Sequence, residues 1–283
     1  MLRDEAMIVR LAISQWTARR FDKRVTEQVA HDYDVNPDVG RYRKILVAEG
    51  AVKEVTKTAG AARTFHYENT LPWDDNGGRI LPAANFLAYS KEMRGLKADF
   101  EKAVAEFVSG YEAYVEEARR RLKAMFKTDD YPSPGRIVRR YGFTFDIEPV
   151  PNFEDFRVNI QNGDAKRIKR EMEKMVADRE AKAMADLYVR LSDVISHFAE
   201  KLSNSKAIFR DSLVENVVEL VNLLPKLNVA NDPKLEKLGK EAQKKLCAYE
   251  PEQLRKDETA REAAADDAKA ILKKMEAYVG AKA

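Results

Sequence analysis

The amino-acid sequence predicts a mainly α-helical protein of the α+β class, with a small β-sheet packed on helices and a long antiparallel, coiled-coil-like helical hairpin. Residues 83–126 and 164–202 carry apolar side chains every three or four positions, and two such stretches of similar length favour pairing of their apolar faces. Residues 6–15 and 140–150 alternate apolar and polar side chains, which is typical of strands with one buried face. The charged fraction of 34%, above the usual share of about a quarter, favours long solvent-exposed helices.

These patterns divide the chain into three consecutive parts. We expect an N-terminal unit of strand, helices and a loop over residues 1–82. The long helical hairpin, with a small β insertion at about 136–160, covers residues 83–204, and residues 205–283 form a helical C-terminal region. Helices with long apolar stripes often complete their burial by self-association, so the pattern also predicts a homo-oligomer.

The first part opens with the strand over 6–15. Thr26 stands where it would cap a short helix over 26–33. The pair Asn36-Pro37 is typical of a helix start, because proline suits the first helical position, and apolar residues then recur at roughly helical spacing over 42–55. We therefore expect further helix before the loop.

The two long segments supply the hairpin. Ten apolar residues of the first segment follow one another with a mean step of about 3.6, the helical period. They are Met93, Leu96, Phe100, Val104, Phe107, Tyr111, Tyr114, Ala118, Leu122 and Met125. At about 1.5 Å per residue, one straight helix over 83–126 would be about 66 Å long, so we expect Gly95 and Gly110 to bend it. The second segment follows the turn Asn162-Gly163, with Asp164 as its N-cap.

Between the long helices, the strand over 140–150 is followed by a second expected strand carrying Phe156, Val158 and Ile160. The C-terminal region begins with an amphipathic helix that contains Ile208, Phe209, Leu213, Val217, Leu220 and Leu224 and is expected to stop at Pro225. Asp232-Pro233 begins another helix, and Pro251 begins the last. Only Ile271, Leu272, Met275 and Tyr278 offer large apolar groups for docking of the last helix, so we expect this tail to fray or to await a partner.

Composition narrows the classes of function. With 50 Lys and Arg against 47 Asp and Glu, the net charge of +3 creates no global attraction to nucleic acid or membrane, so a basic site must be local. The single cysteine, Cys247, suits a reducing cytoplasm, where we place the protein. No run approaches the roughly 20 apolar residues of a membrane span, so we expect no membrane partner.

The most basic local segment is 119–140, where eight Lys and Arg residues against two Asp residues give a net charge of +6. Its members, with the interleaved tyrosines, are Arg119, Arg120, Arg121, Lys123, Lys127, Tyr131, Arg136, Arg139, Arg140 and Tyr141. Cations can follow a phosphate backbone while aromatic rings stack on bases, so the segment predicts contact with single-stranded nucleic acid. The alternative is a solvated helix end, where cations suit the dipole.

A second candidate site is the stretch 60–82, which we expect to be an irregular loop because two prolines and Gly77-Gly78 interrupt it. Its candidates are Arg63, Phe65, His66, Tyr67, Trp73 and Arg79. Trp73 and Phe65 are interpreted as core anchors rather than a ligand cage. His66, Glu68, Asp74 and Asp75 offer metal-binding groups, but without a known ligand spacing, so neither a metal nor a cofactor is expected.

A resemblance adds context. The stretches LAISQWTARRFDKRVTEQVAHDYDVNPDVGRYRKILVA (11–48) and AARTFHYENTLPWDDNGGRILPAANFLAYSKEMR (61–94) resemble uncharacterised proteins of tailed phages and prophages. The resemblance implies the cytoplasm of a bacterial host during infection. It implies no activity and assigns no functional residue.

Three hypotheses follow. The first is a non-enzymatic nucleic-acid-binding protein that binds or anneals single-stranded DNA. The second is a scaffold or adaptor that contacts a phage or host protein, including a role in host takeover or counter-defence. The third, a metal-dependent enzyme using Glu68 and Asp74, has the least support in the sequence, because no catalytic motif with a recognised spacing is present.

Overall fold

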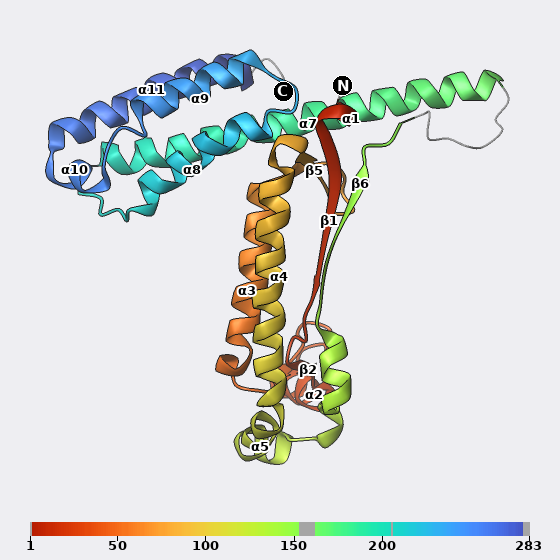
Figure 1. Cartoon of the computed structure of the whole chain (residues 1–283). Coiled ribbons are helices and arrows are strands. Elements are labelled where there is room, and N and C mark those ends of the chain that lie inside the picture. Colours follow the sequence, from red (N-terminus) through yellow and green to blue (C-terminus); the bar gives the residue numbers. More distant parts are fainter. Residues whose placement is uncertain (1, 153–161, 205, 280–283) are drawn as a thin grey trace. The chain divides into compact units, whose positions relative to one another are not determined.

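A computed structural model describes residues 2–152, 162–204 and 206–279. It confirms an α+β protein that is mainly helical (Figure 1). Contacts divide the chain into two compact units, which cut across the three consecutive parts expected from the sequence. Unit 1 comprises Met1–Arg10, Tyr67–Tyr89 and Asp146–Ala283, and unit 2 comprises Leu11–His66 and Ser90–Phe145. Four elements have residues in both units: β1 (Ala6–Ser14), α3 (Glu49–Glu68), α4 (Phe86–Ser109) and β6 (Gly142–Pro149).

Both strands expected from alternation are present, as β1 and β6. With β4 (Leu71–Pro72) and β5 (Gly78–Pro82) they form a sheet of order β4-β5-β1-β6. Strand β1 runs antiparallel to β5, with Ala6 opposite Pro82 and Arg10 opposite Gly78. A short helix, α1 (Leu2–Glu5), precedes the sheet. The second expected strand, with Phe156, Val158 and Ile160, lies outside the described residues.

The stretch 60–82 is not an irregular loop. Helix α3 continues to Glu68, because Val55, Ala59, Ala62 and His66 recur on one buried face. The chain then forms a hairpin of β4 and β5. Its turn includes Gly77, whose φ of +82° lies in the left-handed region that glycine tolerates.

Unit 2 also corrects two expectations about residues 20–55. Helix α2 (Lys23–Asp32) begins one turn earlier than predicted, because Asp22 rather than Thr26 is its N-cap. The chain after Asn36-Pro37 forms turns and then β3 (Arg43–Ile45), which pairs with β2 (Arg19–Phe21). Backbone pairing with β2 replaces the first part of the helix that the apolar spacing over 42–55 favoured, whereas Val52 and Val55 lie in helix α3.

The first long segment forms α4 and α5 (Tyr111–Leu122), with the break at Gly110 and a continuous helix through Gly95. A Cβ atom at Gly110 would lie 3.0 Å from the ring of Tyr114, so a larger residue at the break would require this ring to shift. Helices α3 and α4 lie side by side (Figure 1), and residues of both line one shallow groove. Short elements follow α5: η2 (Lys123–Met125), η3 (Thr128–Asp130), α6 (Pro134–Ile137) and η4 (Val138–Arg140).

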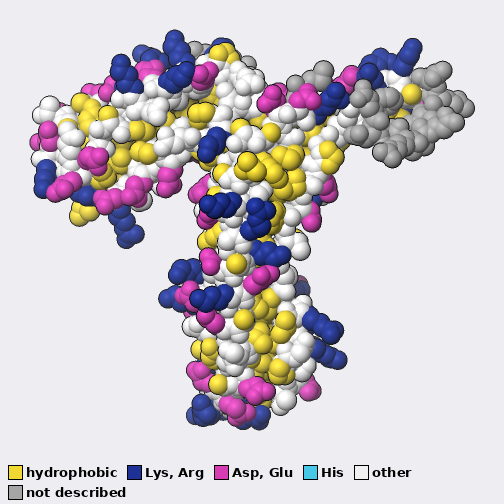
Figure 2. All heavy atoms as spheres, viewed as in Figure 1, with side chains coloured by type: hydrophobic (Ala, Val, Ile, Leu, Met, Phe, Trp, Pro, Cys, Tyr) yellow, Lys and Arg dark blue, Asp and Glu magenta, His cyan; other side chains and the backbone are white. Residues whose placement is uncertain are grey.

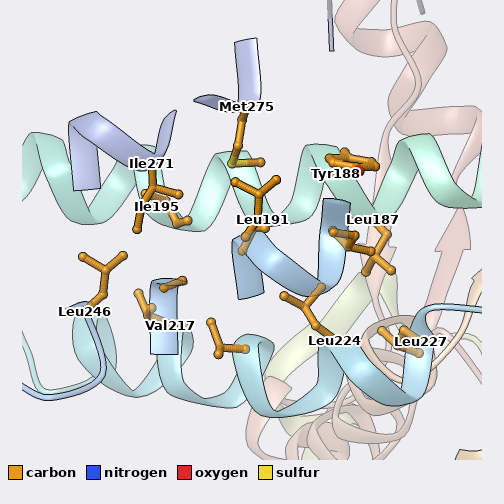
Figure 3. Close-up of a cluster of buried hydrophobic side chains, with 14 of the residues drawn as sticks. Leu187, Tyr188, Leu191, Ile195, Val217, Leu224, Leu227, Leu246, Ile271 and Met275 are labelled. Carbon is orange, nitrogen blue, oxygen red and sulfur yellow. The ribbon is translucent and has the colours of Figure 1, made fainter. Parts of the chain in front are cut away.

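Unit 1 contains the second long segment as α7 (Asn162–Ser203), but the apolar face of α7 does not pack on the first long segment. The remaining helices are α8 (Ser212–Leu227), α9 (Pro233–Lys245), α10 (Pro251–Lys256) and α11 (Glu258–Val279), with η1 (Ala83–Asn85) before α4. The extensive contacts of α7 within unit 1 are with α11 and α8. Figure 3 shows Leu187, Leu191 and Ile195 of α7 pointing toward side chains of α8 and α11. The apolar stripe therefore serves a local helical bundle rather than the expected hairpin partner.

The C-terminal helix is docked rather than frayed. Ala264, Ala265 and Ala268 of α11 are buried together with Ile271 and Met275. Small side chains let α11 approach α7 closely, so alanines supply a packing face that a search for large apolar groups does not detect.

Of two further expectations about helix ends, one is wrong and one is confirmed. Helix α8 continues through Pro225 to Leu227, whereas Asp232 caps α9 with Pro233 at its first position, as predicted. Over 2–152, 162–204 and 206–279, none of the helices is both long enough and apolar enough to cross a membrane.

Candidate nucleic-acid interface

The β2–β3 ribbon of unit 2 presents one outward face. Arg19 pairs with Ile45 and Phe21 with Arg43, so these four side chains share a face, while Arg20 and Lys44 lie on the other. All four outward side chains are exposed, including 47% of Phe21. A ribbon with cations and an accessible aromatic ring on one face can contact both phosphates and bases.

Lys44 joins this ribbon to the predicted basic segment. Its side chain is 2% exposed, and its ammonium group lies 2.5 Å from Asp130 and 3.7 Å from Asp22. It also donates a hydrogen bond of 2.8 Å to the carbonyl oxygen of Met125. A buried ammonium requires such partners, so the segment that contains Met125 and Asp130 is held against β3.

Further contacts fix the basic segment 119–140 on the ribbon. Arg121 donates to the carbonyl oxygen of Ile45 at 3.1 Å, and the Tyr131 hydroxyl donates to that of Leu46 at 2.8 Å. The Tyr131 ring stacks on Phe126 at 5.0 Å, and the Arg119 guanidinium lies 4.5 Å from the centre of the Phe126 ring. Residues 121–131 of this segment are therefore held against the ribbon.

A pocket of about 390 Å³ lies where these parts meet. Its cationic lining residues are Arg20, Lys23, Arg24, Lys44 and Lys127, and its acidic ones are Asp22, Glu27 and Asp130. The buried Lys44 is balanced by Asp130 and Asp22, and Lys23 by Glu27 at 3.4 Å. Arg20 is 3.6 Å from Asp130 yet its side chain is 65% exposed. Arg20, Arg24 and Lys127 can therefore face an anion.

The electrostatics of Asp22 report the cationic character of this pocket. Burial alone would raise the pKa of Asp22, but a hydrogen bond from the Val25 amide and the charges of Lys44, Lys127 and Arg24 outweigh it and lower the pKa. The N-terminus of α2 opens into the same pocket and adds its positive dipole end.

A second pocket of about 860 Å³ lies between the ribbon and the start of α3. It is lined by Arg19 and Arg43 from the ribbon and by Lys53 and Lys57 from α3, against the single acid Glu49. Figure 2 shows Lys and Arg side chains exposed over this part of the molecule next to hydrophobic ones. Cationic pockets therefore flank the ribbon on both sides.

The remaining predicted residues of the basic segment divide into exposed cations and packed tyrosines. Arg120, Lys123, Arg136, Arg139 and Arg140 are exposed. Tyr141 is half-buried, with its ring 5.8 Å from Phe107, and burial raises the pKa of its hydroxyl. Burial likewise raises the pKa of Tyr131 to about 12. Both tyrosines stabilise unit 2 internally, whereas Phe21 on the ribbon and Tyr42 directly before β3 have exposed rings.

The candidates from stretch 60–82 have structural contacts. Within unit 1, Trp73 is buried under the Arg179 guanidinium, 4.6 Å from its ring centre, as expected for a core anchor. Arg79 donates from Nε to the Thr70 hydroxyl at 2.6 Å and lies 4.8 Å from the centre of the exposed Tyr67 ring. Within unit 2, Arg63 donates to the carbonyl oxygen of Ile13 at 3.0 Å, Phe65 is half-buried and His66 is buried.

Asp74, one of the proposed ligands of the metal-dependent alternative, has structural hydrogen-bond partners. Asp74 accepts hydrogen bonds from Arg10 and from the Asn76 and Gly78 amides, so its oxygens serve the β4–β5 turn. Among the residues that the structure describes, no group of three or more His, Cys, Asp or Glu side chains is arranged to hold a metal ion.

The cations Arg19, Arg20, Lys23 and Arg24 lie outside the basic segment 119–140 that the sequence predicts as the site. The signal was present, because four cations surround Phe21 within six residues. What sequence does not show is that Lys127, more than a hundred positions away, lines the same pocket.

The fold and this surface define a mainly helical α+β protein with a cationic, aromatic-bearing ribbon. No family model matches the sequence, and neither a curated protein nor a solved structure is similar to it.

Proposed function

We propose that the protein is a non-enzymatic nucleic-acid-binding protein, and that unit 2 binds single-stranded DNA through the β2–β3 ribbon. One observation carries the proposal: cationic pockets lie on both sides of a ribbon whose exposed face includes Phe21. Arg20, Arg24 and Lys127 would contact phosphates on one side, and Arg19, Arg43 and Lys53 on the other.

The balance of charge and aromatic groups favours single strands. A flexible strand can turn its bases toward Phe21 and Tyr42, both more than 40% exposed, while its phosphates lie in the pockets. Stacking of this kind is tolerant of sequence, because every base has an aromatic face. The proposed activity is therefore binding or annealing without base-specific recognition.

The test is fluorescence anisotropy with a labelled single strand of thymidines and a matched duplex at several salt concentrations. The double variant Arg24→Ala with Lys127→Ala removes two proposed phosphate contacts. We expect its affinity for the single strand to fall about tenfold or more. The slope of log K against the logarithm of the salt concentration should become shallower by about 1.4, which is about 0.7 for each lost phosphate contact.

The matched control is Lys169→Ala with Arg170→Ala on α7, which removes two exposed cations outside unit 2. It should bind like the wild type, apart from the small effect of net charge. Equal losses in both double variants, or no salt-dependent binding at all, would rule the interface out. A preference for the duplex would retain the phosphate contacts but remove the single-strand assignment.

A protein-interaction role is the second candidate, because exposed apolar side chains gather around the end of α2 in Val29, Tyr33, Val35 and Val39. In this role the protein would be a scaffold or adaptor for a phage or host machine, including host takeover or counter-defence. Affinity purification from infected cells tests it, and recovery of the chain without a stoichiometric partner counts against it.

The setting and the assembly state belong to the proposal as well. The resemblance of residues 11–48 and 61–94 to tailed-phage proteins supports a role in the cytoplasm of an infected bacterium. A homo-oligomer also remains part of the proposal, although α8 and α11 cover the apolar stripe of α7 that suggested it. Sedimentation velocity over a hundredfold concentration range tests it, and an unchanging monomer would contradict it.

A further inference from the structure

Unit 1 carries a groove with chemistry opposite to that of the ribbon. It has a volume of about 1030 Å³ and lies between α8 and the segment that runs from Cys247 through α10. Its floor is apolar and consists of Val214, Val218, Cys247, Tyr249 and Pro251. Val218, Cys247 and Tyr249 also pack on the main hydrophobic cluster, so the floor is the outer layer of the core.

Acidic side chains border this floor. They are Asp211, the N-cap of α8, Glu215 and Glu219 of α8, and Glu250 and Glu252 from the opposite wall. In Figure 2, a row of Asp and Glu side chains runs beside hydrophobic ones over the region where Figure 1 draws α8 and α10. Asp211, Glu215 and Glu219 are spaced by four positions, and the backbone of Asp211 is helical, so the three share one face over about 12 Å.

The two basic residues of the groove are already paired. Arg255 forms an ion pair with Asp211, and Lys256 lies 2.5 Å from Glu252. Negative charge therefore remains at Glu215, Glu219 and Glu250. A cationic occupant would relieve this negative potential.

We propose that this groove binds a cationic amphipathic helix of a partner protein. An apolar stripe on such a helix would cover Val218 and Tyr249, while flanking Lys or Arg side chains would pair with Glu215, Glu219 and Glu250. This is the helix-in-groove mode of recognition, in which apolar contacts provide affinity and the charged border selects the partner. The inference does not depend on nucleic-acid binding by unit 2, because the groove consists entirely of unit 1 residues.

Cys247 provides a site-specific readout, because it is the only cysteine of the chain and lines the groove floor. The probe is an 18-residue amphipathic peptide of leucine and lysine, compared with a leucine and glutamate peptide of the same pattern. N-ethylmaleimide, which is uncharged, labels the full-length protein with and without peptide, and mass spectrometry gives the rate. Burial raises the pKa of the Cys247 thiol, so labelling is measured at pH 8.

We expect saturating lysine peptide to slow labelling at least fivefold at low salt, with protection lost toward 0.5 M salt. The glutamate peptide should give no protection. The variant Glu215→Gln with Glu219→Gln should weaken lysine-peptide affinity about five- to tenfold, because it removes two ion pairs. The matched control Glu258→Gln with Glu262→Gln, an exposed pair at the same spacing on α11, should retain wild-type affinity.

Circular dichroism confirms that each variant is folded. Equal protection by the two peptides, or an unchanged affinity of the groove variant, would overturn the proposal. So would peptide binding that leaves Cys247 labelling unchanged. If labelling slows as the protein alone is concentrated, a second copy occupies the groove and the assignment to a separate partner is wrong.

Discussion

The ammonium of Lys44 lies 2.5 Å from the carboxylate of Asp130, and both side chains are largely buried in unit 2, at 2% and 11% exposure. The pair connects β3 to the segment that follows α5, which are separated by more than eighty positions in the chain. The ion pair therefore holds the segment that contains Lys127 against β3, so that Lys127 and the ribbon cations are positioned together.

The first prediction concerns this pair. Replacing Lys44 by Met leaves Asp130 and Asp22 without their buried cation, so the free energy of unfolding of unit 2 should fall by about 3 kcal/mol. Trp16 packs on Tyr111 at 5.8 Å within unit 2, so urea unfolding followed by tryptophan fluorescence in a Trp73→Phe background reports this unit. Arg43→Met, on the exposed face of the same strand, should cost less than about 0.5 kcal/mol. Similar losses in the two variants would contradict the assignment.

The second prediction compares an exposed ring on the ribbon, Phe21, with an exposed ring outside it, Tyr33. Phe21→Ala should weaken binding of a single strand about tenfold, which corresponds to one lost base stack of about 1–3 kcal/mol. Tyr33→Ala removes a ring that is 76% exposed but lies beyond the ribbon, at the end of α2, and should change affinity less than twofold. Anisotropy titration measures both. If Tyr33→Ala has the larger effect, the aromatic contact has been placed on the wrong side of α2.

Local signals predicted most elements of this fold. The apolar stripe of α7, the Asp232-Pro233 start of α9 and the break at Gly110 all follow from rules that act within a few residues. The same rules were wrong after Asn36-Pro37, where pairing of β3 with β2 overrides the helical spacing. Pairing between strands separated by twenty residues is not visible to a helical periodicity.

The partners of each element were harder to predict than the elements themselves. The sequence indicated that α7 needs an apolar cover, but many helices could supply it, and the close approach of α11 depends on Ala264 and Ala268. For the site, the charge of segment 119–140 was visible, whereas the hydrogen bond from Tyr131 to Leu46 spans 85 positions. Such contacts depend on tertiary structure, so the sequence alone favours base stacking by Tyr131 over the packing role that the structure gives it.

The third prediction concerns pH. The hydrogen bond from Arg10 lowers the pKa of Asp74 below its ordinary value of 3.8, with a smaller opposing effect of burial and further lowering by the Gly78 and Asn76 amides. A lowered folded-state pKa stabilises the protein above the unfolded-state value, and this contribution disappears as pH falls through the folded-state value. Unit 1 should therefore lose stability below about pH 4, as reported by Trp73 fluorescence in a Trp16→Phe background.

Asp74→Asn should lower the free energy of unfolding by about 1–3 kcal/mol at pH 7, because charged hydrogen bonds of this kind are lost. Its stability should also vary less than that of the wild type between pH 5 and pH 2.5. Asp75→Asn, an exposed neighbour, is the control and should follow the wild-type curve. If the Asp74→Asn curve runs parallel to the wild type at all pH values, the Arg10 pairing does not produce the lowered pKa.

The last prediction concerns Arg261, which is 8% exposed and fixes α11 to the end of α7. Its guanidinium donates to the carbonyl oxygens of Lys201 and Leu202, at 3.0 and 3.1 Å, and to those of Asn204 and Ala207 beyond the helix. The final carbonyls of a helix lack partners within the helix, so one planar, multidentate cation satisfies several of them at once.

Arg261→Lys keeps the charge but offers one compact ammonium, which cannot replace donors spread over a guanidinium plane. We expect it to lower the free energy of unfolding by about 2 kcal/mol, and Arg261→Met by about 3 kcal/mol, because buried carbonyls then lose their donors. Hydrogen exchange of the amides in the last turns of α7 and the first turns of α11 should accelerate together, since one residue connects them. The control is Arg255, whose guanidinium lies over Phe209 as that of Arg261 does, but whose side chain is 39% exposed. Arg255→Met should lower the free energy of unfolding by less than about 1 kcal/mol and leave this exchange slow. Unchanged exchange in Arg261→Met would show that packing of the α11 alanines, rather than the guanidinium, holds the two helices together.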